Sequence, residues 1–359
     1  MSLNLGSGPS PARARSLSLT WVVVIALVVA GAAIAGTAAA FELKPAGPST
    51  PPASTPPTTT NNTTGPRTPE TVNVTDDLGR HVTVPYDPAR VVVLSPSIMD
   101  IVFRLGLRSH VVGVDCYAPL GNSGLSEDYS PDQIALWGLN GSMCVQVGPS
   151  FALETLAVLE PQLVLASTIV SVAAVEEITS SLGVPVVMLQ PPTLSGILVD
   201  DSLVGAIFNV TGAATTLNAE LNSALYNATN VAAQVYTFPT VLVTYSVDSN
   251  GYWSFGPGTF GESLIELCGA TSISANATTA YPELSPAQVL IDDPQYIVYG
   301  TGFGLNESTY AGGPDWSDFP AVQAGNVTGL NSNWLTEPDP TMILLGIPAL
   351  QAVFYPGLA

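Results

Sequence analysis

The sequence predicts an α/β protein built as two similar lobes that are joined by a helical segment. Two blocks of the chain alternate short apolar strands with helical patterns, which is typical of parallel sheets covered by helices. Between the blocks, residues 193–236 show helical patterns and no strand signal. A short repeat, at 153–167 and 286–300, links the blocks because each copy has an apolar helix, a Pro-Gln turn and an apolar strand.

The first block opens with a predicted hairpin at 72–85, where alternating valines surround a turn at Asp77-Leu78-Gly79. A βαβ unit follows, because a helix from about Pro96 to Leu105 separates two apolar runs. Ser95 suits the N-cap of that helix and Gly106 its C-terminal end. The expected strands of this block are 91–94, 111–114, 162–166 and 185–189, the last two each preceded by a helix.

The connecting segment reads as two helices that are broken at Gly212. The second block then predicts a strand at 240–247, a helix at 259–269, and a helix followed by a strand within 286–300. Residues 339–354 read as a closing helix that Pro348 bends. The expected boundaries are an N-terminal lobe at 70–210, a helical connection at 211–236 and a C-terminal lobe at 237–359.

The segment that precedes the first lobe predicts an extracytoplasmic protein. Residues 21–41 are an apolar run long enough to span a bilayer, and the basic residues before it place residues 1–20 in the cytoplasm. The alternative is a cleaved signal peptide that ends near Ala38-Ala39-Ala40, which leaves the protein secreted. Residues 42–69 are rich in Pro and Thr and predict an extended stalk.

Charge narrows the range of partners. The net charge of −20 argues against nucleic acid and against anionic membrane surfaces. No Lys or Arg follows Arg108, whereas residues 109–359 carry 22 Asp and Glu. The second lobe therefore does not hold an anion with guanidinium groups.

The glycosylation sequons and the cysteines are also typical of an extracytoplasmic protein. Nine Asn-x-Ser/Thr sequons predict a glycosylated surface, and with the low charge they are typical of an archaeal, acid-exposed protein. They begin at Asn61, Asn62, Asn73, Asn140, Asn209, Asn227, Asn276, Asn306 and Asn326. Cys116 and Cys144 can close a disulfide loop worth about 3 kcal/mol, and Cys268 suits a buried thiol, although three cysteines leave the pairing open.

Four stretches form an ordered set of motifs across residues 70–358. They are VTDDLGRHVTVPYDPARVVVLSPSIMDIVFRLGLRSHVVGVD (74–115), ALETLAVLEPQLVLA (152–166), GPGTFGESLIELCGA (256–270) and PAVQAGNVTGLN (320–331). The sequence resembles, in these stretches, the class III substrate-binding proteins of ABC importers, which bind cobalamin, haem or ferric siderophores. The resemblance implies the class III periplasmic-binding-protein fold, in which a long helix, here within 211–236, bridges two α/β lobes with the ligand in a cleft between them.

The resemblance also implies roles for particular residues near the carboxyl ends of strands. The implied ligand-binding residues are Ser95, Pro96, Ser97 and Tyr117 in the first lobe and Tyr245, Trp253, Phe255, Tyr299, Thr301, Phe303 and Trp334 in the second. Helix capping is the alternative for the serines, and core packing for each aromatic ring. Glu154 matches the acidic residue that docks on permease arginines, and its second-lobe counterpart is Glu262 or Glu266. A solvated helix face is the alternative for all three.

Catalytic and metal-site patterns are lacking in the sequence. It contains only two histidines, His81 and His110, and no phosphate-binding glycine loop, nucleophile elbow or zinc-protease motif. We therefore expect no enzyme, no catalytic residues, no cofactor and no resident metal ion.

The expected function is that of an extracytoplasmic, monomeric substrate-binding component whose partners are an ABC permease and its ATPase. The scarcity of basic residues favours a neutral or cationic iron or cobalt chelate, either a cobalamin-like corrinoid or a hydroxamate siderophore. The alternative is a non-transport surface glycoprotein, an adhesin or a sensor ectodomain, on the same fold. Neighbouring genes for a permease and an ATPase would distinguish the two.

Overall fold

A computed structural model of the chain describes residues 70–116, 129, 131–147, 151, 153–302 and 304–358. The predicted cytoplasmic, membrane and stalk segments (1–69) lie outside the described residues, as do Tyr117 and Phe303. None of the described helices combines the length and the apolar character that a membrane-spanning helix needs.

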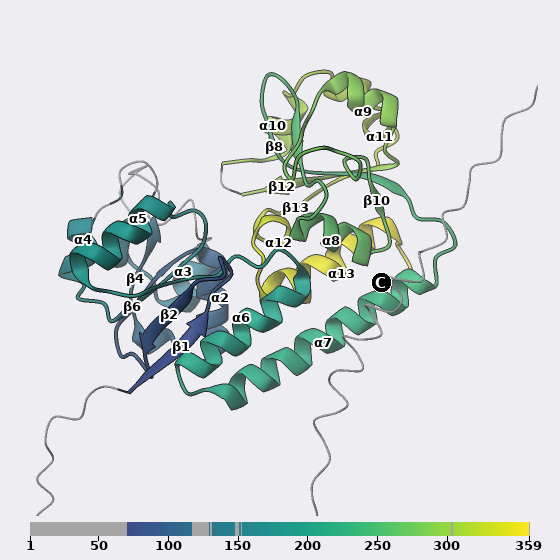
Figure 1. Cartoon of the computed structure of the whole chain (residues 1–359). Coiled ribbons are helices and arrows are strands. Elements are labelled where there is room, and N and C mark those ends of the chain that lie inside the picture. Colours follow the sequence, from purple (N-terminus) through teal and green to yellow (C-terminus); the bar gives the residue numbers. More distant parts are fainter. Residues whose placement is uncertain are drawn as a thin grey trace, which may run out of the picture. The chain divides into compact units, whose positions relative to one another are not determined.

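The first lobe is built on a parallel sheet of five strands (Figure 1). Its strands are β3 (Val91–Leu94), β4 (Val111–Cys116), β5 (Cys144–Gln146), β6 (Leu163–Ala166) and β7 (Val186–Met188), in the order β5-β4-β3-β6-β7. Every residue of β3 is buried, because alternate side chains enter core clusters on opposite faces of the sheet. This two-sided burial explains why the central strands are continuous apolar runs in the sequence.

Helices and turns surround this sheet. They are α2 (Pro96–Arg104), η1 (Arg108–His110), α3 (Pro131–Trp137), η2 (Gly141–Met143), α4 (Leu153–Val158), and α5 (Val172–Glu177) with its π-helical continuation η3 (Ile178–Leu182). Ser95 is the N-cap of α2, and Gly106 follows its end with a φ of 78°. The predicted ends of this helix are thus accurate to about one residue.

The predicted hairpin is present as β1 (Thr71–Thr75) and β2 (His81–Pro85), and its turn is fixed to the edge of the sheet. Asp76 binds Arg80 in an ion pair and accepts from the backbone N–H of Met188 in β7. Arg80 also donates to the carbonyl of Val186, 3.1 Å away. The Asp-Asp-Leu-Gly-Arg turn therefore covers the open edge of β7, which is a structural role.

Two helices, α6 (Leu194–Ile207) and α7 (Thr211–Ala233), follow the first sheet and pack side by side (Figure 1). The chain reverses at Asn209, which has a φ of 57°, a conformation that asparagine tolerates well. The predicted break at Gly212 is wrong, because Gly212 lies in the first turn of α7. Gly205 allows the close approach, since a Cβ there would lie 2.5 Å from that of Ala214.

The second lobe has a mixed six-stranded sheet. Its strands are β8 (Thr240–Val247), β9 (Tyr252–Ser254), β10 (Thr271–Ser272), β11 (Glu283–Leu284), β12 (Tyr296–Thr301) and β13 (Val327–Asn331). The order is β11-β9-β8-β12-β13, and β10 pairs with the other end of β8. β8, β12 and β13 run parallel, as the alternating pattern predicted, whereas β9 and β11 add antiparallel strands.

The remaining helices belong to the second block and to the C-terminal segment. They are α8 (Phe260–Leu267), α9 (Pro286–Asp292), α10 (Glu307–Ala311), η4 (Trp316–Asp318), α11 (Pro320–Gln323), α12 (Asn333–Thr336), η5 (Met342–Gly346) and α13 (Ile347–Phe354). The predicted closing helix is present as η5 and α13, and Pro348 lies two residues after Gly346, where the π-helical turn η5 gives way to α13.

The C-terminal segment is tied to the first lobe through Asp100. One carboxylate oxygen of Asp100 accepts from the backbone N–H and the hydroxyl of Thr341, at 3.1 and 3.0 Å, and from Arg104. Arg104 also donates to the Thr341 hydroxyl. Helix α2 and the start of the closing helical segment are thus joined by a small polar network.

Candidate ligand-binding surface

The Ser95-Pro96-Ser97 turn lies at the carboxyl end of β3, the central strand of the first sheet. The hydroxyls of Ser95 and Ser97 are 2.7 Å apart and bond to each other, so neither side chain caps the helix. Ser95 is 2% exposed and Ser97 5% exposed, and Pro96 is buried. The tripeptide therefore forms buried support behind the strand end rather than an open surface.

Three aromatic side chains cluster beside the carboxyl-terminal half of β8. The rings of Tyr245 and Phe255 lie 4.9 Å apart, and the Tyr281 ring stands nearly perpendicular to Tyr245 at 6.4 Å. Phe255 is 2% exposed, Tyr245 is half-buried and Tyr281 is 46% exposed. We call Tyr245, Phe255 and Tyr281 the aromatic platform. Its exposure increases from Phe255 to Tyr281, and a large flat ligand can cover its exposed part.

The platform rests on the first turn of α8. A Cβ on Gly261 would lie 2.2 Å from the Phe255 ring, so glycine is needed for this contact. Burial, with a smaller contribution from Tyr281, raises the pKa of Tyr245 to about 12. The phenol is therefore neutral, and the platform offers apolar faces without charge.

Sequence reasoning missed Tyr281 because the loop between β10 and β11 has no periodicity. The available signal was its place in a Tyr-Pro pair just before a short strand that pairs with β9. That signal places Tyr281 near β9, but the contact with Phe255 at 6.4 Å is known only from the structure.

The other predicted aromatic contacts are placed differently. Trp253 is half-buried, and its indole N–H donates to Asp248 at 3.1 Å. Tyr299 is 6% exposed and packs on Tyr310 and Trp316 in the core of the second lobe, so it offers little surface to a ligand.

Two further predicted residues, Thr301 and Trp334, follow strands of the second sheet. Thr301 donates its hydroxyl to the carbonyl of Leu330 in β13, which uses its only proton within the sheet. Trp334 is half-buried in α12, and Gly346 packs against its backbone. Trp334 is therefore partly accessible to a ligand, whereas the Thr301 hydroxyl is already used within the sheet.

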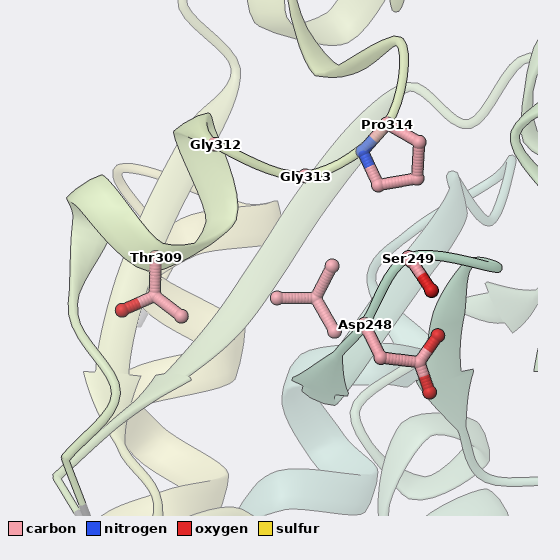
Figure 2. Close-up of a pocket in the computed structure, with 7 residues that line it drawn as sticks. Asp248, Ser249, Thr309, Gly312, Gly313 and Pro314 are labelled. Atoms are coloured by element: carbon pink, nitrogen blue, oxygen red, sulfur yellow. The ribbon is translucent and has the colours of Figure 1, made fainter.

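A hollow of about 290 Å³ lies elsewhere in the second lobe, between the β8–β9 turn and the loop after α10. Figure 2 shows Thr309 on one side of it, Asp248 and Ser249 on the other, and the loop of Gly312, Gly313 and Pro314 running across the top. None of the predicted ligand residues lines it, and it is smaller than the pockets that usually hold a cofactor-sized molecule. It is therefore not the site that the sequence predicted.

The described arginines are all engaged inside the fold. Arg80 and Arg104 form the two ion pairs of the described residues, with Asp76 and Asp100. Arg90 donates to the carbonyls of residues 159 and 160, and Arg108 to those of residues 111, 137 and 138. All four arginines of the described residues thus belong to the first lobe and bond to protein groups. The described residues contain no cluster of three or more potential metal ligands.

The acidic residues predicted to dock on a permease differ in exposure. Glu154 is exposed in the first turn of α4, and Glu266 is exposed near the end of α8. Glu262 is 7% exposed, and burial, with a smaller contribution from Glu266, raises its pKa to about 7. Of the two second-lobe candidates, Glu266 is therefore the one that presents its carboxylate to solvent.

The cysteines occupy the two states that the sequence indicated. Cys116 and Cys144 form a disulfide that joins the neighbouring strands β4 and β5. Cys268 is a free, fully buried thiol in the C-cap of α8. The disulfide fits an oxidising compartment.

Comparison with known proteins gives consistent matches over this part of the chain. A family model described as periplasmic binding protein matches residues 91–333. A curated cobalamin-binding protein of Halobacterium salinarum is 27% identical over 274 residues, which cover 73% of this chain and 68% of that protein. A curated vitamin B12-binding protein of Vibrio cholerae is 22% identical over 260 residues, covering 71% and 86%.

Solved structures share the fold. The periplasmic vitamin B12 binding protein of Vibrio cholerae has a TM-score of 0.59 and 22% identity, covering 75% of this chain and 98% of that one. An ABC-type Fe3+-hydroxamate transport protein of Saccharomonospora viridis has a TM-score of 0.63 and 17% identity, covering 79% and 99%. At these identities the structures establish a common architecture for proteins whose ligands differ.

Proposed function

Because the chain belongs to the periplasmic binding protein family, whose model matches residues 91–333, we propose that it is the extracytoplasmic substrate-binding component of an ABC importer. Its ligand is a neutral or cationic metal chelate, and a cobalamin-like corrinoid is the first choice. A ferric hydroxamate is the second. The curated relatives named for cobalamin and vitamin B12 support the first choice, and the hydroxamate-transport structure supports only the fold.

The aromatic platform is the observation that carries this proposal. Tyr281 and Tyr245 present ring surface next to a strand end, where parallel sheets usually bind ligands. A corrin ring and its side chains can cover such a surface, and dispersion and desolvation of the rings then favour binding. No Lys or Arg follows Arg108, so the second lobe, which carries the platform, has no cationic side chain to attract an anionic chelate.

The importer partners follow from the same proposal. Glu154 and Glu266 each present an exposed carboxylate, one from α4 and one from α8. Two carboxylates on separate lobes suit two basic patches on a permease dimer. The N-terminal segment at 21–41 then either anchors the protein outside the membrane or exports it as a signal peptide.

A ligand panel tests the proposal directly. The exported chain is titrated with cyanocobalamin, a neutral ferric hydroxamate, haem and a tri-anionic ferric catecholate, with binding followed by quenching of tryptophan fluorescence and by calorimetry. We expect the tightest binding for cyanocobalamin and none for the catecholate. Tight binding of the catecholate contradicts the charge argument, and no binding to any of the four favours a non-transport surface protein.

A further inference from the structure

The asparagines of the Asn-x-Ser/Thr sequons share one structural property. Seven sequons fall within the described residues, and the asparagine of every one is exposed. They are Asn73, Asn140, Asn209, Asn227, Asn276, Asn306 and Asn326. They lie on both lobes and on the helices between them, so exposure is not the property of a single region.

Asparagines outside sequons provide the comparison within the same chain. Six of them are described, and only Asn230, Asn250 and Asn331 are exposed. Asn218 and Asn222 are half-buried, and Asn333 is buried. Full exposure therefore accompanies the sequon rather than asparagine in general.

Two sequons show a side-chain arrangement that leaves the reacting atom available. In Asn140-Gly141-Ser142, the Ser142 hydroxyl donates to the amide oxygen of Asn140. In Asn306-Glu307-Ser308, the Ser308 hydroxyl donates to Asn306 in the same way. Each bond occupies the amide oxygen, and Nδ2, the atom that carries a sugar, has no hydrogen-bond partner among the described residues.

Both of these asparagines also sit at helix N-caps. Asn140 caps η2 and Asn306 caps α10, each accepting from a backbone N–H through its oxygen. The capping bonds use the amide oxygen of each asparagine and not Nδ2. A substituent on Nδ2 therefore leaves both caps intact. Asn326 differs because its Nδ2 donates to the carbonyl of Gln295, 3.1 Å away.

We propose that the protein is N-glycosylated at these exposed sequons, with Asn140 and Asn306 as the best-placed sites. In the reaction, Nδ2 bonds to the anomeric carbon of a lipid-linked oligosaccharide diphosphate, and the bond between that carbon and the diphosphate breaks. The proton of Nδ2 passes to a base of the membrane transferase, and the lipid diphosphate leaves. The proposal rests on the extracytoplasmic location proposed above, because such transferases act on exported chains.

None of the sequon asparagines lies on the two helices that carry the proposed docking carboxylates. No sequon asparagine lies between residues 141 and 208, the stretch that contains α4 and its Glu154, and none lies on α8 with its Glu266. Carbohydrate at the seven sites therefore does not modify the two elements that present the docking carboxylates. Asn276 is the site nearest in sequence to the platform, five residues before Tyr281.

The test uses the full chain isolated from the cells that make it. Proteolytic peptides are analysed by mass spectrometry, and the peptides with Asn140 and Asn306 are expected to carry a carbohydrate mass on the asparagine. Ser142→Ala and Ser308→Ala remove the sequon hydroxyls and should each abolish modification at one site. Ser142→Thr and Ser308→Thr keep the sequons and should preserve it.

Matched controls separate modification from folding and from location. Peptides with Asn230 and Asn250, which are exposed but outside sequons, are expected at their unmodified mass. The unfolding midpoints of the alanine variants, produced without carbohydrate, show whether the fold is intact. Unmodified Asn140 and Asn306 overturn the proposal, and protease accessibility on whole cells then tells whether the proposed location has failed as well. The ligand panel, run on unmodified protein, is independent of both.

Discussion

Gln162 and Gln295 make the same backbone contacts in two different sheets. The side-chain oxygen of Gln162 accepts from the N–H groups of residues 89 and 90, at 2.7 and 3.1 Å, just before β3. That of Gln295 accepts from the N–H of Thr240, at 3.2 Å, at the start of β8. Each glutamine follows a proline, and the residue before that proline is left-handed in both cases, with φ of 45° at Glu160 and 43° at Asp293. The two lobes are thus built around one repeated helix–turn–strand unit.

This equivalence predicts similar costs for the same substitution in either lobe. Gln162→Ala and Gln295→Ala each remove an acceptor from backbone donors at the start of a central strand. We expect each to lower the free energy of unfolding by about 1 kcal/mol, measured by urea denaturation, because the freed donors can partly turn to water.

Matched variants show whether the acceptor is responsible. Gln162→Glu keeps a side-chain oxygen and should retain most of the stability. Gln288→Ala removes an exposed glutamine of α9 that bonds only to Asp292 in its own helix, and should cost less than about 0.5 kcal/mol. If Gln288→Ala costs as much stability as Gln162→Ala and Gln295→Ala, the two turns have no special role.

Buried carboxyl groups predict that the protein is most stable in acid. Burial raises the pKa of Asp200 and Asp201 to about 8, with smaller contributions from Asp77 and Asp100 respectively. No carboxylate oxygen of Asp200 or Asp201 has a partner among the described residues. Burial also raises the pKa of Asp339, and Asp100 adds to the effect. Arg104 acts in the opposite direction, because its charge lowers the pKa of Asp201 and of Asp339.

The sign follows from the protons bound in each state. Between about pH 4 and pH 8 the folded protein keeps Asp200 and Asp201 protonated, whereas the unfolded chain ionises them. The free energy of unfolding therefore falls as pH rises through this range, by at most about 1.4 kcal/mol per pH unit for each group. Urea denaturation at pH 4, 5, 6 and 7 measures the slope.

A single amide substitution tests the origin of that slope. Asp201→Asn cannot ionise, so the free energy of unfolding should depend less steeply on pH by up to about 1.4 kcal/mol per unit. Glu176→Gln, on the exposed face of α5, should leave the slope unchanged. A slope that is the same in wild type and Asp201→Asn would show that Asp201 ionises inside the fold.

The disulfide predicts a redox-dependent stability. Cys116 and Cys144 are 28 residues apart, and opening the loop should lower the free energy of unfolding by about 3–4 kcal/mol on the chain-entropy model. Urea denaturation with and without reductant measures this loss. Cys268 is fully buried and burial raises its pKa, so a thiol reagent should label no cysteine in the oxidised native protein and one after unfolding. Labelling of the native protein would contradict this assignment.

Much of the architecture could be predicted because its signals are local. The run at 91–94, Ser95 and Gly106 determine a strand, a cap and a helix end from neighbouring residues. The short strands β9, β11 and β13 could not be found in this way, because they exist through pairing with distant strands. Gly212 does not break the helical segment, because it lies inside the first turn of α7, and the chain reverses at Asn209 instead.

The candidate site was harder to predict for the same physical reason. Tyr299 and Tyr281 are equally aromatic in the sequence, yet one fills the core with Tyr310 and the other faces solvent beside Phe255. Exposure depends on which loop folds over which ring, and no local pattern encodes it. The two serines of the Ser-Pro-Ser turn likewise satisfy each other, a contact that their spacing allows but does not require.

The exposed glutamates predict a transport defect without a binding defect. Glu154→Lys and Glu266→Lys reverse charges that we propose meet basic residues of a permease. Each should lower ligand uptake by cells about tenfold, or ~1.4 kcal/mol, while the affinity of the isolated protein for the ligand stays unchanged. Glu176→Lys, a charge reversal at another exposed glutamate, on α5, should leave uptake unchanged. A similar loss with Glu176→Lys would indicate a general effect of charge instead of docking.

The aromatic platform predicts which ring contributes most to ligand affinity. Tyr281 is the most exposed of the three rings, so its contact with a ligand forms at little cost to the core. Tyr281→Ala should weaken cyanocobalamin binding about 10- to 30-fold, or ~1.4–2 kcal/mol, because an aromatic surface is lost. Tyr281→Phe keeps the ring and should bind within about threefold of wild type.

A matched tyrosine shows whether position matters as well as chemistry. Tyr226 is 56% exposed on α7, so Tyr226→Ala removes a comparable exposed ring away from the platform. We expect its ligand affinity to equal that of wild type in the same calorimetric titration. If Tyr226→Ala and Tyr281→Ala weaken binding equally, or if neither does, the ligand does not cover the platform. Because Tyr281 packs edge-on against Tyr245 and Phe255, the unfolding midpoint of Tyr281→Ala distinguishes a lost ligand contact from a disturbed cluster.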